Sequence, residues 1–173
     1  MLRTRHLAGA IAAAMLLANA AQATDRSTFN HVVVFGDSLS DAGNLPNTAG
    51  AYDKFTTNPG QVTVQNVADQ LGLDLQPSRL GGSDYAYGGA GITTNSDPAP
   101  QIQTITQQVN GYLANGAKAD PHSLYMIWGG ANDIFYHSTQ YGVGVVIPGY
   151  GETLQQATTN INAAATQEVA LIN

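Results

Sequence analysis

The sequence predicts an α/β fold, a three-layer αβα sandwich around a mainly parallel sheet. Short apolar runs alternate with longer segments in which apolar residues recur at helical spacing. The short runs are continuous rather than alternating, which is typical of strands buried on both faces of a parallel sheet. Both runs end at glycine, so residues just beyond the carboxyl ends of the strands are predicted to form a site.

The predicted strands and helices follow one another along the whole chain. The first strand is predicted over residues 31–35, His-Val-Val-Val-Phe, and the second over residues 123–128, Ser-Leu-Tyr-Met-Ile-Trp. Apolar residues spaced by three or four positions predict three helices. These helices cover residues 61–71, 102–113 and 153–173. Residues 140–151, rich in glycine, tyrosine and valine, predict a loop before the last helix.

The composition indicates a folded domain with a weakly charged surface. Of the 173 residues, 43% are hydrophobic and 10% are charged, which is enough apolar side chain for one core. The formal net charge of −6 disfavours nucleic acid as a partner. The chain has no cysteine, so disulfides and thiolate metal sites are excluded.

The first 23 residues have the features of a secretory signal peptide. Two arginines precede an apolar run over residues 7–17, and Ala-Gln-Ala at residues 21–23 provides a small-residue cleavage site. A short buried or membrane helix is the less favoured alternative, because the run is shorter than the roughly 20 residues that a membrane span requires. We therefore expect residues 1–23 to be removed and residues 24–173 to belong to one domain of an exported protein.

The strongest functional signal is a serine, Ser38, directly after the first predicted strand. Residues 35–44 read Phe-Gly-Asp-Ser-Leu-Ser-Asp-Ala-Gly-Asn. Two further segments follow in order, Asp-Tyr-Ala-Tyr-Gly-Gly-Ala at residues 84–90 and Gly-Ala-Asn-Asp at residues 130–133. Together they resemble blocks I, II and III of the GDSL (SGNH) family of lipases and esterases. The resemblance extends over residues 31–135.

The resemblance implies a serine hydrolase with the flavodoxin-like αβα fold of this family. Ser38 then takes the place of the nucleophile. Three donors take the place of the oxyanion hole: the backbone N–H groups of Ser38 and Gly89 and the side-chain amide of Asn132. Such donors must already point to where acyl transfer places negative charge. We also expect Ser38 to begin a helix, whose dipole favours that charge, and Gly89 to allow close approach of the substrate. No metal ion and no organic cofactor is implied.

Three other features of these motifs have local interpretations. Ser40 stands where the Gly-x-Ser-x-Gly motif of α/β-hydrolases has its second glycine, so that fold is disfavoured. Asp37, Asp41 and Asn44 have the chemistry of calcium ligands, but an acidic pair after a strand more often orders a turn, and we expect this structural role. Asp84 stands where the family often has asparagine, which affects the hydrogen bonds of the local loop.

The base is the missing part of the implied mechanism. A serine nucleophile needs a base to accept its proton, and in the GDSL family an Asp-x-x-His motif near the C-terminus supplies it. None of the four histidines, at positions 6, 31, 122 and 137, lies in such a motif. We therefore expect the chain to be truncated, with the Asp–His pair beyond Asn173, and to be inactive by itself. His137 as a surrogate base is a less favoured alternative to a simple loop histidine.

Two functions from different classes are compatible with the sequence. The first is a secreted esterase or lipase acting on small-molecule or lipid esters, located in the periplasm, outside the cell or on the outer-membrane surface. An outer-membrane anchor is expected only if a tail like that of autotransporters follows. The second is a non-catalytic secreted domain that binds lipid or glycan and has lost its base. The motifs leave short esters, lipids and acetylated sugars open as substrates.

Overall fold

The computed structural model describes residues 29–46, 54–56, 60–96, 99–114, 116, 118–142 and 151–172. The predicted signal peptide lies outside these residues. The elements in chain order are β1 (His31–Gly36), α2 (Thr63–Gln70), η1 (Ser78–Leu80), α3 (Ile105–Ala114), β2 (Ser123–Trp128), α4 (Ala131–Gly142) and α5 (Leu154–Ile172). Within the described residues, no helix combines the length and the apolar character that crossing a membrane requires.

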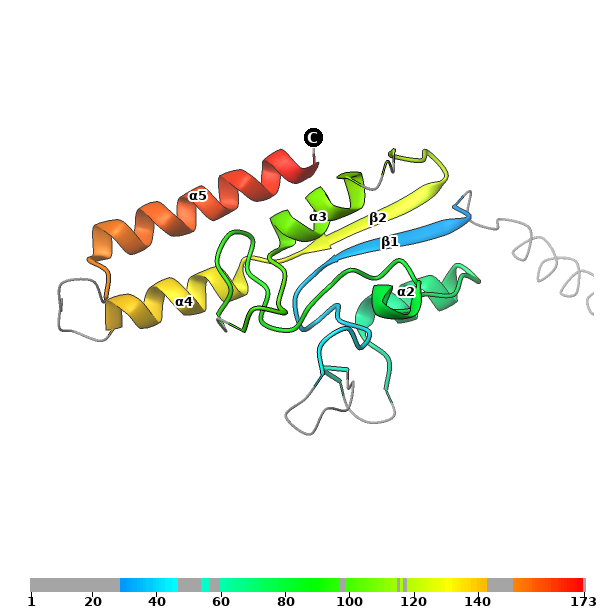
Figure 1. The fold of residues 1–173 in the computed structure, drawn as a ribbon, viewed down its shortest axis with the longest axis horizontal. Coiled ribbons are helices and arrows are strands. Elements are labelled where there is room, and N and C mark those ends of the chain that lie inside the picture. Colours follow the sequence, from blue (N-terminus) through cyan, green and yellow to red (C-terminus); the bar gives the residue numbers. More distant parts are fainter. Residues whose placement is uncertain are drawn as a thin grey trace, which may run out of the picture.

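The two strands lie side by side and run in the same direction. They pair from His31 with Ser123 to Gly36 with Trp128, so their carboxyl ends meet at one edge of the sheet (Figure 1). Gln108 of α3, buried at 1% exposure, fixes the end of β1. Its side chain accepts a hydrogen bond from the Gly36 N–H at 2.9 Å and donates one to the Gly36 carbonyl at 3.0 Å. The predicted parallel pairing is therefore confirmed.

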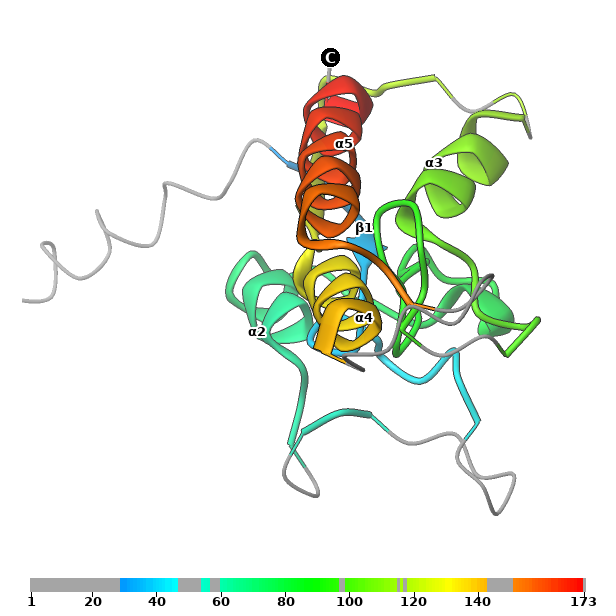
Figure 2. The same cartoon turned by 90° about the vertical axis from the view of Figure 1, so that its left-hand side faces the viewer.

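Helices cover both faces of the strand pair, as the sandwich fold requires. Successive side chains of β1 point to opposite faces. Val32 and Val34 pack with residues of α2, whereas Val33 and Phe35 pack with residues of α3 and α5. Figure 2 shows α2 and α3 on opposite sides of β1, and Figure 1 shows α5 returning above α4 towards α3. The α/β sandwich predicted from the sequence is confirmed.

The α-helix α4 was not expected from the sequence. Residues 131–142 form α4, and the predicted loop over residues 140–151 begins after Gly142, with residues 143–150 outside the described part. Over residues 131–140, where burial is described, the side chains that α4 buries are polar: Asn132, Asp133 and His137. Hydrophobic periodicity cannot detect a helix whose buried face is polar, which is why the helix was missed.

Two glycines provide a matched test of the packing. A Cβ atom on Gly91 would lie 1.9 Å from the carbonyl oxygen of Thr94, whereas a Cβ atom on Gly111, inside α3, has no neighbour within 4 Å. Gly91→Ala should therefore lower the free energy of unfolding by about 2 to 3 kcal/mol. Gly111→Ala should raise it by about 0.5 to 1 kcal/mol through the better helix propensity of alanine. Urea unfolding of both variants measures this, and changes of the same sign would contradict the packing described.

Candidate active site

Ser38 lies in a tight turn at the carboxyl end of β1. The carbonyl of Asp37 accepts hydrogen bonds from the N–H groups of Ser40 and Asp41, both at 3.0 Å. Ser38 is half-buried, and no hydrogen bond of its hydroxyl is found within the residues described. An unpaired, partly accessible hydroxyl is free to meet a substrate or a base.

The expectation that Ser38 begins a helix is wrong. The N–H groups of Gly43 and Asn44 donate to the side chain of Asp41, at 2.8 and 2.6 Å, instead of to helical carbonyls. Gly43 has a φ of 117°, which is incompatible with a right-handed helix. The chain therefore turns away after Ser38, and no helix dipole contributes at this serine.

Asp41 and Asn44 connect the serine turn to the second motif. The Asp41 carboxylate also accepts the Gly88 N–H at 2.9 Å. The Asn44 amide donates to the carbonyls of Asp84 and Ala86, at 2.8 and 2.9 Å. These contacts confirm the expected structural role of both residues. Within the part of the chain that the structure describes, no group of three or more His, Asp or Glu side chains could hold a metal ion.

Asp84 is fully buried beside this network. Its carboxylate accepts the N–H groups of Ala42 and Ala86, at 2.7 and 3.0 Å. Burial raises the pKa of Asp84 to about 7, and the neighbouring charge of Asp41 adds to the effect, while the two backbone bonds act against it. Burial also raises the pKa values of Asp37 and Asp41. The turn that carries Ser38 thus rests on carboxyl groups that burial makes harder to ionise.

The two glycines of the second motif have different roles. A Cβ atom on Gly88 would lie 3.1 Å from Leu45 and 3.9 Å from the Cβ of Ser38, so this loop lies directly against the serine. Gly89 has a φ of 81°, in the left-handed region that favours glycine. Backbone conformation therefore requires glycine at position 89, in addition to the expected need for close approach.

Asn132 and Asp133 lie in the first turn of α4, just after β2. The Asn132 amide donates to the carbonyl of Ala90 at 2.9 Å and accepts the hydroxyl of Ser96 at 2.8 Å. The Asp133 carboxylate accepts the N–H groups of Ile92, Thr93 and Thr94, at 2.6, 3.1 and 3.2 Å. The third motif is therefore bonded both to the last residue of the second motif and to the chain segment that follows it. Ser96 was not singled out by the sequence, because a lone serine in a polar loop carries no pattern.

A small cavity of about 210 Å³ opens beside Ser38. Its walls are mainly apolar, with one cation and one carboxylate at its margin. The residues that line it with Ser38 are Asp41, Leu45, Pro46, Lys54, Phe55 and Gly88. The structure thus places the predicted nucleophile in a pocket suited to a short apolar group.

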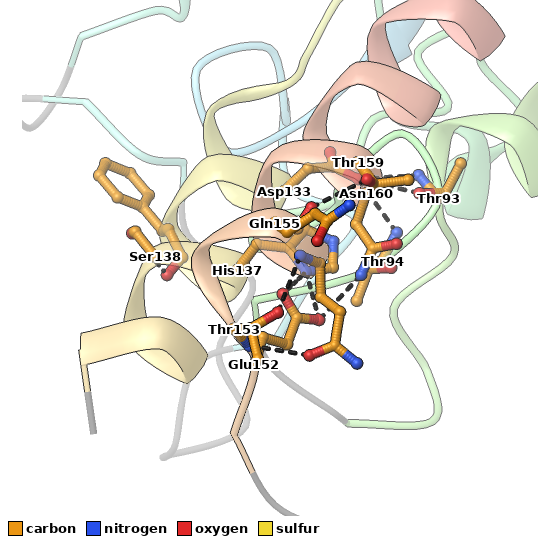
Figure 3. A network of polar contacts seen from close by, with 12 residues as sticks. Thr93, Thr94, Asp133, His137, Ser138, Glu152, Thr153, Gln155, Thr159 and Asn160 are labelled. Carbon is orange, nitrogen blue, oxygen red and sulfur yellow. Dashed lines mark hydrogen bonds and ion pairs between the residues drawn. The ribbon is translucent and has the colours of Figure 1, made fainter. Parts of the chain in front are cut away.

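His137 is a buried helical residue and not the loop histidine that was expected. It lies on α4 at 4% exposure. Its Nδ1 atom lies 2.9 and 3.0 Å from the two carboxylate oxygens of Glu152, which also accepts the Asn160 amide at 2.9 Å (Figure 3). No hydrogen bond between His137 and Ser38 is found among the described residues. Glu152 lies just before α5, and through His137 of α4 and Asn160 of α5 its carboxylate links the two helices.

The buried carboxyl groups predict how stability depends on pH. In the unfolded chain they ionise near pH 4, whereas in the folded chain Asp84 keeps its proton to about pH 7. The folded state therefore binds more protons in this range, and the contribution of Asp84 to the free energy of unfolding falls by about 1.4 kcal/mol per pH unit as the pH rises. Asp84→Asn should remove this part of the slope in urea unfolding measured across the range. Identical slopes for the two proteins would show that the carboxyl is ionised throughout.

The contact between α4 and α5 gives a second stability test. Glu152→Ala should lower the free energy of unfolding by about 2 kcal/mol, because His137 and Asn160 lose their shared acceptor in a partly buried place. Glu168→Ala on α5 makes the same charge change at a side chain for which no hydrogen bond is found in the described part of the chain. Urea unfolding compares the two, and equal losses would exclude a specific role of Glu152.

Comparison with known proteins agrees with these motifs. The sequence model of the family described as GDSL-like Lipase/Acylhydrolase matches residues 32–173. The chain is 36% identical over 123 residues to a protein named Lipase 1 from Photorhabdus luminescens, covering 69% of this chain and 18% of that protein. It is 32% identical over 165 residues to proteins named Esterase EstA from Pseudomonas aeruginosa and Pseudomonas putida, covering 71% of this chain and 25% of each relative. The chain thus spans a quarter or less of the length of these relatives. It belongs to the family of GDSL-like lipases and acylhydrolases.

Proposed function

We propose that this protein hydrolyses carboxylic esters, with Ser38 as the nucleophile. The observation that carries the proposal is the position of Ser38, whose hydroxyl is unpaired within the described residues and lies in a small apolar cavity at the carboxyl edge of the sheet. Membership in the family and the names of the relatives, lipase and esterase, support the same reaction. The volume of about 210 Å³ favours esters with a short acyl group.

In this mechanism the Ser38 hydroxyl oxygen attacks the ester carbonyl carbon, and the negative charge moves to the carbonyl oxygen. The N–H groups of Ser38 and Gly89 and the amide of Asn132 donate to that oxygen. The serine proton passes through a histidine base to the leaving alcohol, and water then releases the acid from the acyl-enzyme. We assign the base to the Asp-x-x-His pair of the family, which these 173 residues do not contain.

We further propose that the protein is exported. The support is the basic start, apolar run and small-residue site of residues 1–23. Export would place the protein in the periplasm, outside the cell or on the outer-membrane surface. Ester substrates outside the cytoplasm, small molecules or lipids, are the partners that this location favours.

The nucleophile can be tested in the whole protein with a fluorophosphonate probe, which reacts quickly only with an activated serine. Wild-type protein should be labelled, and Ser38→Ala should not. Ser138→Ala, an exposed serine of α4 whose hydroxyl donates to the Phe135 carbonyl, is the matched control and should be labelled like wild type. Equal labelling of wild type and Ser38→Ala would refute the proposed nucleophile.

A further inference from the structure

The amide of Asn132 can assist an oxyanion only in one orientation. The NH₂ end of an asparagine side chain donates hydrogen bonds, and the oxygen end only accepts them. Rotation of the amide by half a turn would present an oxygen atom to the developing negative charge and repel it. A residue that fixes this rotation therefore affects how well the transition state is bound, without touching the substrate.

Two contacts from opposite ends fix the Asn132 amide. Its nitrogen donates one hydrogen to the Ala90 carbonyl at 2.9 Å, which leaves the second hydrogen for an oxyanion. Its oxygen accepts the hydroxyl of Ser96 at 2.8 Å. A rotated amide would set its oxygen against the Ala90 oxygen and leave the Ser96 hydroxyl without its acceptor. The observed orientation keeps an N–H of the amide, rather than its oxygen, available as a donor.

Ser96 also contacts the second proposed oxyanion donor. Its backbone N–H donates to the carbonyl of Gly89 at 3.1 Å. Its hydroxyl lies 3.3 Å from the same oxygen, but its single hydrogen fits the shorter contact to Asn132 better. One exposed serine thus bonds to both Gly89 and Asn132, which come from different motifs of the chain.

Hydrogen bonds of Asp133 and Asn95 fix the loop that carries Ser96. Asp133 gathers the N–H groups of Thr93 and Thr94, and Figure 3 shows both threonines gathered around this carboxylate. Asn95 accepts the Gly91 N–H at 3.2 Å and donates to the Ile102 carbonyl at 2.8 Å. The loop is therefore closed tightly just before Ser96, so the place of the serine hydroxyl is set by the backbone.

We propose that Ser96 is a positioning residue that holds the Asn132 amide and the Gly89 peptide ready to bind the oxyanion. This inference rests on the proposed ester hydrolysis. Ser96 does not touch the reacting atoms in this scheme, so its loss should reduce kcat and leave KM nearly unchanged.

The experiment compares Ser96→Thr with Ser96→Val in the whole protein, using hydrolysis of p-nitrophenyl butyrate. Threonine and valine have nearly the same shape and differ in the hydroxyl, so both substitutions should affect folding equally. We expect Ser96→Thr to retain activity and Ser96→Val to lose roughly tenfold in kcat, the scale of one hydrogen bond. Ser138→Ala is the control for loss of an exposed serine hydroxyl, and it should behave like wild type.

A double-mutant cycle with Asn132→Ala separates positioning from a merely structural effect. If Ser96 acts through the Asn132 amide, Ser96→Val should cause much less further loss in kcat once that amide is gone. An undiminished loss in the Asn132→Ala background would overturn the inference, as would equal kcat values for Ser96→Thr and Ser96→Val. Full activity of Ser38→Ala would instead refute the proposed function, so the two failures are distinguishable.

Discussion

The carboxylate of Asp41 is the interaction on which the rest of the site depends. It accepts N–H groups from both sides of the site, at Gly43 and Asn44 in the serine turn and at Gly88 in the second motif. Without these bonds the turn after Ser38 would have several buried N–H groups unpaired, which costs about 1 to 3 kcal/mol for each group. Asp41 therefore sets both the shape of the turn and its distance from the glycines.

This arrangement carries an electrostatic cost. Asp37, Asp41 and Asp84 are each at most 3% exposed, and burial raises the pKa of all three. In the described part of the chain, the hydrogen-bond donors found for these three carboxylates are backbone N–H groups. Such donors have fixed positions, so the carboxylates hold the backbone in one conformation at the expense of stability at neutral pH. The buried carboxylates thus lower the free energy of unfolding at neutral pH but give the backbone around Ser38 a defined geometry.

The sequence sufficed where a pattern has a direct physical cause. Continuous apolar runs identified both strands, and parallel pairing explains why residues after Gly36 and Trp128 share one edge. The sequence was not sufficient where a feature depends on contacts that form only in the folded chain. The polar buried face of α4 hides that helix from periodicity, and Glu152 meets His137 only because the chain folds back. The roles of Ser38, Gly89 and Asn132 stay predictions of the motifs.

The adjacent residues Asn132 and Asp133 both contact the loop that contains Ser96, through different bonds. Asp133 lies in the first turn of α4, where a negative charge is favoured by the helix dipole, and it builds the loop before Ser96. Ser96 then returns to the amide of Asn132. His137 lies one turn after Asp133 on the same face of α4, and it contacts Glu152, which also accepts the amide of Asn160 on α5. The buried polar side chains of α4 thus take part both in the contact with α5, through His137, and in the orientation of the Asn132 amide.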